Sequence, residues 1–363
     1  MNYFKISVLL IAISFTGSAF AQPYTDSRSV TKSFKAMPGT TVDINNKYGK
    51  VEVTTWNKDS VRIEANLSIK TSSTTKMMKL RNMISFDISA TGHYILARTV
   101  FTSSGFISDL KDWAESLVSG AGEVSIDYTI KMPASLNLKI TNKYGDVYTD
   151  NISGEVQISL ANGGLKANDF TGITNIDLSF GDGYINSMTN GRIILSYANL
   201  SLKNTNQCSL ESKSSKIDID HAESLKMNMK RDKLNIGNVR YLTGQTYFAD
   251  IWITNLSDEI NIDTQFGKLT AITVDKGFSF INVRSEYTDL DFSFEHGSAF
   301  DYDLTYYKDV FLQLPKEAVK NDEKTSSTDM SMKTTFGHVG NSTSNKMLKI
   351  SMAKKASLSI FLK

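Results

Sequence analysis

Residues 248–265 read FADIWITNLSDEINIDTQ, and the phrase FGKL follows at 266–269. Isoleucine recurs at every second position in two short runs of this stretch, IWI at 251–253 and INI at 260–262, with polar residues on either side of each run. Alternation with a period of two buries one face of a β-strand and leaves the other in water. Apolar residues at this spacing would be spread around a helix instead of gathered on one side. The stretch therefore predicts two short strands, and the polar residues around Leu256 favour a bend between them.

A four-residue phrase opens this stretch and recurs along the chain. It consists of an aromatic or small residue, Gly or another small residue, often Asp, Lys or Asn, and usually an aliphatic residue. Clear copies start at Tyr48, Tyr144, Phe248, Phe266 and Phe336. From residue 144 onward the phrase starts at 144, 162, 180, 197, 214, 231, 248, 266 and 287, which gives steps of 18, 18, 17, 17, 17, 17, 18 and 21 residues. So short and regular a period is the signature of a solenoid, in which each repeat is one coil stacked on the last.

We therefore predict an all-β fold, a single-stranded parallel β-helix or solenoid with coils of 17–18 residues. An antiparallel sandwich also has short alternating strands, but it has no reason to repeat its turns so regularly. The aliphatic fourth position of the phrase should form an inward ladder, and the aromatic first position a second ladder. We expect the aromatic ladder to pack at a corner of the coil, and a strip on which sugars stack is the functional alternative.

The N-terminus has the features of a secretory signal peptide. Residues 1–5 include a lysine, residues 6–15 are apolar, and residues 18–21 read SAFA. This pattern predicts a signal peptide over 1–21 that is cleaved after Ala21. No later segment approaches the roughly 20 apolar residues of a spanning helix, so we expect no transmembrane segment after cleavage. The predicted location is the periplasm, the outer surface or the extracellular space.

The charge balance and the cysteine content limit the classes of function and structure that the chain can have. The 40 basic and 38 acidic residues nearly cancel and are scattered, so no basic cluster indicates a nucleic-acid partner. The single cysteine, Cys208, rules out an internal disulfide. A secreted chain without disulfides needs a large core instead, and we expect Cys208 to be a buried small hydrophobe.

The chain divides into a leader and one solenoid domain over 22–363. Two lead-ins of similar form, FKAMP at 34–38 and TIKMP at 129–133, each precede an alternating strand, which suggests that coils begin twice. Within the domain we predict first coils at 30–84, an insertion at 85–123, a main coil array at 124–312, a polar loop at 313–331 and closing strands at 332–363.

The insertion contains a helical pattern. Phe106, Leu110, Trp113 and Leu117 recur at steps of three and four, which predicts an amphipathic helix over 106–118. We expect the helix to cover an open coil end or the flank of the solenoid, because a bare edge strand invites pairing with other chains. Docking to a partner is the alternative, and these four residues are then the candidate interaction residues. The acidic polar face argues against an anionic lipid surface.

No pattern converges on catalysis or on a cofactor. Carboxylate pairs on stacked coils serve some β-helical polysaccharide lyases and hydrolases, and the candidates here are Asp218, Asp220, His221, Asp289, Asp291, Glu295 and His296. An outer strand face is polar by construction, so we predict no catalytic residue and no enzyme.

The third position of the phrase offers possible metal ligands. Stacked carboxylates could share a hard cation, and the acidic members are Asp146, Asp182, Asp250 and Asp289. The same position also holds residues that would repel a cation, namely Lys50, Lys216, Lys233 and Lys268. We therefore predict no metal and no cofactor.

The chain resembles the bacterial putative-adhesin β-solenoid family in three features. They are the leader, the phrase Asn-x-Tyr-Gly-x-Val at 46–51 and 142–147, and the coils turned by Gly, Asp and Asn. This family of secreted and envelope proteins has a domain of unknown function. The resemblance covers most of the mature chain and implies a β-helix-like fold, an adhesin role and no catalytic residues. The predicted function is a non-enzymatic, adhesin-like solenoid whose strand face binds an envelope or surface protein, or a glycan. A carbohydrate-active β-helix enzyme and a periplasmic structural or sensory domain of an envelope-stress system are the alternatives.

Overall fold

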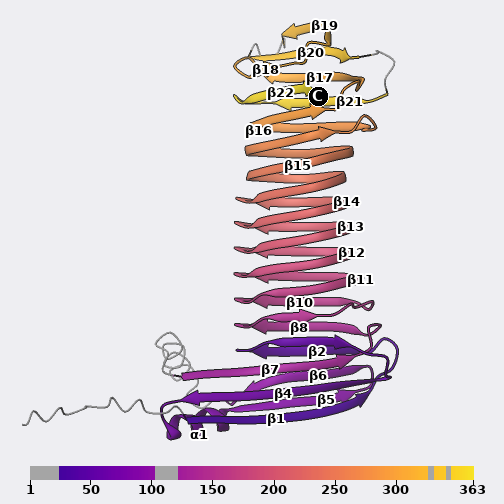
Figure 1. Cartoon of the computed structure of the whole chain (residues 1–363). Coiled ribbons are helices and arrows are strands. Elements are labelled where there is room, and N and C mark those ends of the chain that lie inside the picture. Colours follow the sequence, from indigo (N-terminus) through magenta and orange to yellow (C-terminus); the bar gives the residue numbers. More distant parts are fainter. Residues whose placement is uncertain (1–23, 103–121, 326–330, 341–344) are drawn as a thin grey trace, which may run out of the picture.

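The computed structural model describes residues 24–102, 122–325, 331–340 and 345–363. They form a rod in which strands stack along the long axis (Figure 1). In this part of the chain the one helix is α1 (Thr74–Met83). The all-β solenoid that the repeat predicts is therefore confirmed. The predicted signal peptide at 1–21 and the predicted helix at 106–118 with its four candidate residues lie outside the described residues.

Parallel coils make up the middle of the rod. Its strands are β8 (Asn137–Lys143), β9 (Val147–Thr149), β10 (Val156–Ala161), β11 (Leu165–Ser179), β12 (Asp182–Ser196), β13 (Asn199–Lys213), β14 (Lys216–Lys230), β15 (Lys233–Val274) and β16 (Phe280–Phe294). Each coil runs along one face, bends, and returns along the other (Figure 1). We call the segment that follows each phrase the first face and the segment that precedes the next phrase the second face. In β12, Ile185 pairs with Leu202 on the first face and Ile193 pairs with Leu210 on the second.

Two inward ladders fill the space between the faces. On the first face the aliphatic fourth positions are at most 2% exposed, as predicted; they are Val147, Leu165, Leu200, Ile217, Leu234, Ile251, Leu269 and Leu290. On the second face the equivalent buried residues include Ile158, Ile176, Ile193, Leu210 and Met227. Each such side chain contributes about 1.5–3 kcal/mol by its burial. Cys208 is also buried, as expected, and burial raises the pKa of its thiol to about 12.

The first position of the phrase adopts a left-handed backbone conformation. Ten non-glycine residues among those described have φ between 51° and 69°, and they are Tyr48, Tyr144, Asn162, Phe180, Tyr197, Ser214, Arg231, Phe248, Phe266 and Tyr287. This conformation costs an L-residue about 1–2 kcal/mol. Backbone hydrogen bonds between coils offset part of that cost, as from the Phe180 amide to the Ser196 carbonyl at 3.0 Å. The copy predicted at Phe336 is wrong as a coil turn, because that residue lies inside an antiparallel strand with no positive φ.

Buried asparagine side chains explain the Asn-x-Tyr-Gly phrase. The Asn142 amide nitrogen donates to the carbonyls of Gly49 and Gly145, both at 2.9 Å. Asn46 donates in the same way to Gly49 at 3.3 Å. A Cβ on Gly145 would lie 2.0 Å from the Gly49 carbonyl oxygen. Glycine is therefore required here because neighbouring turns approach through their backbones.

Antiparallel strands close the N-terminal end. This end contains β1 (Tyr24–Lys35), β2 (Thr41–Lys47), β3 (Val51–Thr55), β4 (Ser60–Thr71), β5 (Ile84–Thr91), β6 (Tyr94–Phe101) and β7 (Gly122–Met132). The coil formed by β2 and β3 lies between β8–β9 on one side and β6–β7 on the other. Next in the stack, β5 pairs with β6, β4 with β7 and β1 with β4, all antiparallel. The prediction of plain coils over 30–84 is therefore wrong for β1 and β4.

Side chains of β1 cover the open edge of β5. Arg28 and Lys32 donate to the carbonyls of Ile84 and Ile88, at 2.9 and 2.6 Å. Such cover reduces pairing with other chains at a sheet end. The sequence interpretation missed α1, which links β4 to β5 and begins at the N-cap Ser73. The helix has no buried residue, so its apolar signal is weak.

A coil from the end of the sequence is inserted between two earlier coils at the C-terminal end. This end contains β17 (Phe300–Tyr307), β18 (Phe311–Gln313), β19 (Ala318–Thr325), β20 (Met332–Val339), β21 (Met347–Met352) and β22 (Ser357–Leu362). Strand β21 pairs in parallel with β16 on one side and β17 on the other. Strand β22 lies in the same way between β16 and β18. The inserted coil thus has backbone partners on both sides.

The antiparallel hairpin β19–β20 covers β17 at this end. The prediction of a polar loop over 313–331 is therefore wrong for 318–325, where backbone pairing with β20 forms a strand. Its charged sequence, AVKNDEKT, lacks alternation, and it is typical of an edge strand that avoids further pairing.

Candidate functional site

Aromatic rings from the phrase stack along the turn edge of the rod. The stacked pairs have centroid distances of 4.7–5.4 Å and interplanar angles of at most 13°; they are Tyr48–Tyr144, Phe180–Tyr197, Phe248–Phe266 and Phe266–Tyr287. These distances match the strand spacing of about 4.8 Å, so the coil period itself places the rings in contact. About half of the Phe248 and Tyr287 side chains is exposed. The rings therefore lie at the corner, as expected, but pack on one another outside the core.

The second face carries outward amide side chains on several of its coils. They are exposed or half-buried, and they are Gln157, Asn175, Asn228, Gln245, Asn261 and Asn282. Bonds between coils hold several outward groups in place. The Asn282 amide donates to Asn261 at 2.8 Å, and Arg284 donates to both carboxylate oxygens of Asp263, at 2.5 and 3.0 Å. A bidentate pair of this kind fixes the orientation of both groups.

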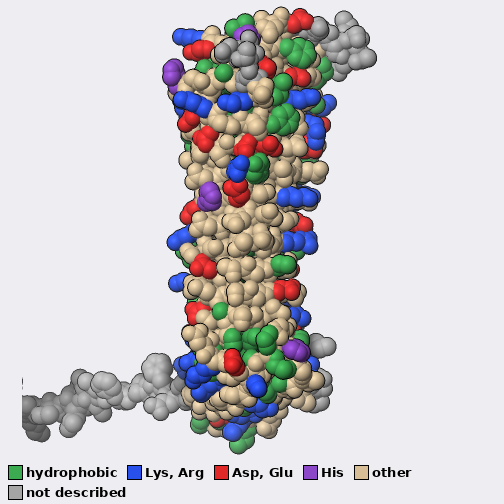
Figure 2. All heavy atoms as spheres, turned by 90° about the vertical axis from the view of Figure 1, so that its right-hand side faces the viewer, with side chains coloured by type: hydrophobic (Ala, Val, Ile, Leu, Met, Phe, Trp, Pro, Cys, Tyr) green, Lys and Arg blue, Asp and Glu red, His purple; other side chains and the backbone are tan. Residues whose placement is uncertain are grey.

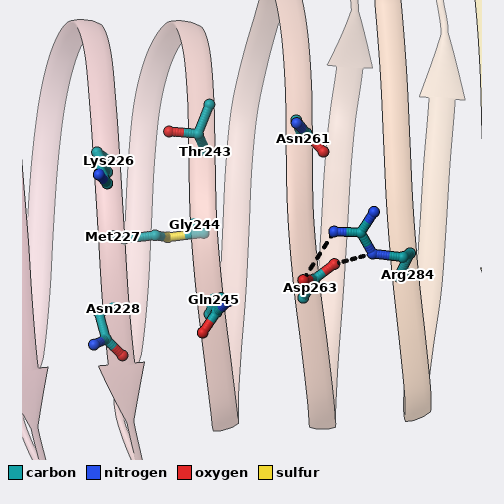
Figure 3. Close-up of a pocket in the computed structure, with 9 residues that line it drawn as sticks. All are labelled: Lys226, Met227, Asn228, Thr243, Gly244, Gln245, Asn261, Asp263 and Arg284. Atoms are coloured by element: carbon teal, nitrogen blue, oxygen red, sulfur yellow. Dashed lines mark hydrogen bonds and ion pairs between the residues drawn. The ribbon is translucent and has the colours of Figure 1, made fainter.

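A depression of about 350 Å³ lies in the second face over Gly244. Its lining is drawn in Figure 3 and consists of Lys226, Met227, Asn228, Thr243, Gly244, Gln245, Asn261, Asp263 and Arg284. Gly244 takes the inward position that Met227 holds on the preceding coil, and the Met227 side chain extends toward it (Figure 3). With φ of 139°, a Cβ at residue 244 would lie 1.9 Å from the Met227 carbonyl oxygen. Glycine at 244 therefore allows the backbones of two coils to approach closely where they line the depression.

A second depression of about 280 Å³ continues the first along the strands. The two share Asn228, Gln245 and Asp263, so we treat them as one groove, the Gly244 groove. Tyr247 and Gln265 line its far end. The groove thus leads from the middle of the second face to the turn edge.

Among the described residues, the groove meets the longest run of stacked rings. The Tyr247 ring lies edge-on to Phe248 at 4.6 Å and to Phe266 at 5.6 Å. Phe266 in turn stacks on Tyr287. Lys230 places its ammonium 5.7 Å from the centre of the Tyr247 ring, within reach of a cation–π contact. The same coils therefore supply the hollow and the aromatic edge.

The carboxylates considered for catalysis bond to neighbouring coils. Asp218 accepts a hydrogen bond from Asn235 at 2.6 Å, Asp291 pairs with Lys268 at 2.8 Å, and Glu295 accepts from the Lys276 amide at 3.0 Å. Among the described residues, no hydrogen bond joins two of the seven side chains considered for catalysis. These acidic side chains therefore form bonds that connect neighbouring coils.

The phrase carboxylates considered for a metal have hydrogen-bond donors as partners. Asp146 accepts from the Gly164 amide at 2.8 Å, Asp182 from Asn199 at 2.7 Å, and Asp289 from the Ser357 amide at 2.8 Å. In the described ranges, no group of three or more His, Cys, Asp or Glu side chains is arranged to hold a metal ion.

The bend edge of the rod has a mixed charge. Figure 2 shows basic and acidic side chains interspersed along it, with hydrophobic side chains gathered near its base. Arg240 pairs there with Glu223 at 2.9 Å and with Asp258 at 3.2 Å. Exposed pairs of this kind contribute at most about 1 kcal/mol each. Their alternating signs give no basic surface of the kind that binds nucleic acid.

Asp232 is a buried carboxylate in the second position of a phrase. It accepts hydrogen bonds from the Ser215 amide at 2.7 Å, the Lys230 amide at 2.6 Å and the Ser212 hydroxyl at 2.9 Å. Burial raises the pKa of Asp232 above its ordinary value, and these hydrogen bonds offset only part of the shift. The carboxylate replaces glycine at this turn and ties together backbone groups of two coils.

We expect Asp232→Ala to destabilise the fold, because the buried Ser215 amide would lose its acceptor at about 1–3 kcal/mol and the part-buried Lys230 amide would lose a second bond. Since burial raises its folded-state pKa, the contribution of Asp232 is fully present below the unfolded pKa of about 4 and falls as the pH rises through the folded pKa. Urea unfolding of both chains should show a larger difference in stability at about pH 3.5 than at pH 7. A difference that increases with pH would contradict the raised pKa.

Comparisons with known proteins find similarity to solved structures alone. No family model matches the chain, and no curated protein matches it. The chain is similar to the crystal structure of a putative cell adhesion protein from Clostridium sporogenes ATCC 15579, at 8% sequence identity and a TM-score of 0.17. The match covers 93% of this chain and 100% of the other. At this TM-score the similarity carries no conclusion about function, so the adhesin resemblance of the turn phrase stays a prediction.

Among the described residues no helix has the length and apolar character to cross a membrane.

The sequence interpretation missed the Gly244 groove. Its signal was a glycine at 244 where the aligned preceding coils carry Leu210 and Met227.

Proposed function

We propose that the protein is an exported, non-enzymatic binding rod, an adhesin-like solenoid that binds protein or glycan on its second face. The observation that supports this most is the Gly244 groove, a hollow lined by outward polar side chains and bordered by half-exposed stacked rings. Ligand sites are usually concave, with apolar or aromatic walls and a few convergent polar groups that fix the orientation of the ligand. The filled core supports the same proposal, because it holds the outward groups at fixed positions.

An adhesin-like role requires the rod to lie outside the cell. We expect a membrane-impermeant amine reagent to label the protein in intact cells, since Lys166, Lys226 and Lys233 are exposed. Lysed cells are the control, because there the reagent reaches every compartment. Labelling only after lysis would show that the rod is not exposed at the cell surface and would contradict the adhesin-like role.

A further inference from the structure

We propose that the Gly244 groove is a subsite for an extended oligosaccharide, a refinement that rests on the proposed binding function. The groove follows the strand direction from Lys226 and Thr243 to Tyr247. The five residues from 243 to 247 are separated by four steps, which span about 13 Å at roughly 3.3 Å per residue. A straight groove of this length accommodates consecutive units of an extended chain.

The polar groups of the groove suit hydroxyl-rich ligands. The side-chain amides of Asn228 and Gln245 are exposed and form no hydrogen bond with other described residues. Each amide offers both donors and an acceptor, as neighbouring sugar hydroxyls do. Asp263, fixed by its bidentate bond to Arg284 (Figure 3), presents a further acceptor at a constant position. Such preorganisation lowers the entropic cost of binding.

The charge of the groove favours a neutral or weakly acidic chain. Asp263 and Arg284 form an ion pair, which leaves Lys226 as the remaining charged group of the first depression. A polymer with a charge on every unit would meet too few cations here. A neutral oligosaccharide fits this balance better.

Aromatic side chains at the end of the groove supply apolar contacts. Tyr247 forms a wall there, and Phe248, Phe266 and Tyr287 continue as a stacked strip. The faces of such rings are electron-rich, and the C–H groups on one side of a pyranose ring are their natural partners. A chain that leaves the groove past Tyr247 therefore reaches a surface that suits sugar rings.

A peptide is a weaker candidate for this position. Extended peptides bind solenoids and sheets mainly by adding a strand to an open edge. The groove lies in the interior of the sheet, where β14 already pairs with β15 and β15 with β16. No free strand edge is available there. Recognition there depends on side chains alone, which suits hydroxyl groups better than a peptide backbone.

The test is calorimetric titration of the full chain with cellohexaose, chitohexaose and maltohexaose. We expect one of the flat β-linked chains, cellohexaose or chitohexaose, to bind more tightly than the curved maltohexaose. Gln245→Ala should raise the dissociation constant about tenfold, as expected for the loss of one or two hydrogen bonds. Gln245→Trp, which fills the groove from an exposed position, should abolish binding.

Gln207→Ala is the matched control, because Gln207 is an exposed glutamine outside the groove. It should change the dissociation constant less than twofold, and all variants should keep the unfolding temperature of the unaltered chain. Binding that Gln245→Trp leaves intact would overturn the groove assignment while the proposed function stands. Binding of a surface protein but of no hexasaccharide would do the same. If neither sugars nor surface proteins bind, the groove assignment and the proposed function both fail.

Discussion

A chain that lacks residues 345–363 is expected to lose the ordered C-terminal end of the rod. The deletion removes β21 and β22, which lie between β16 on one side and β17 and β18 on the other. It also removes five core side chains that are at most 1% exposed, namely Leu348, Ile350, Met352, Leu358 and Ile360. Hydrogen exchange should show lost amide protection in β16–β20, and a synthetic peptide of residues 345–363 should restore it.

Point substitutions in β21 test the same insertion without shortening the chain. Ile350→Asp places a charge in the core and should cost about 4 kcal/mol or more, because a buried charge without a partner is strongly destabilising. Lys349→Thr is the control, because Lys349 is exposed on the same strand, and it should change stability by less than about 0.5 kcal/mol. Equal stability of the two variants would show that β21 is not inserted as described.

Gly145→Ala is expected to destabilise the coil turns by about 3 kcal/mol or more. The added Cβ would lie 2.0 Å from the Gly49 carbonyl oxygen, and that oxygen also accepts the hydrogen bond from Asn142. Neither the added Cβ nor the Gly49 oxygen can move away without separating the two coils that meet at this turn. The unfolding midpoint in urea should fall, and amide exchange should rise first in β3 and β9, which pair across this turn.

Gly277→Ala is the control for this substitution. A Cβ on Gly277 meets nothing within 4 Å, and its φ is not positive. The control should leave the unfolding midpoint unchanged or raise it slightly, since alanine restricts the unfolded chain more than glycine does. A Gly145→Ala chain as stable as the control would contradict the close approach of the two turns.

The coil array could be predicted from the sequence because its determinants are local and repeated. Alternation around Ile251 and Ile260 assigned the strands, and the spacing of the phrase located the turns, where the structure has its positive φ values. The role of Asn142 could not be predicted, because its bond to Gly49 joins residues 93 positions apart. The sequence also could not predict the order in which the coils stack along the rod. Apolar and polar residues in 347–352 would alternate in the same way whichever coils lay on either side of this strand.

The rest of the fold was missed where the usual signals are weak. The helix α1 has no buried residue, so no apolar stripe marks it. Strand β19 is charged along its length and is held by backbone pairing with β20. The Gly244 groove is lined by residues of three strands, β14, β15 and β16. A single glycine in a strand pattern suggests a bulge or a close approach, but the spatial link to Tyr247 and Arg284 requires the structure.

The most direct test of a non-enzymatic binding rod is the binding of the full chain to an array of polysaccharides and surface proteins. The heat-unfolded chain is the control for non-specific adsorption. The account predicts saturable binding to at least one ligand, with no new reducing ends released from any polysaccharide. Absence of saturable binding would contradict the binding function, and release of reducing ends would show a carbohydrate-active enzyme instead.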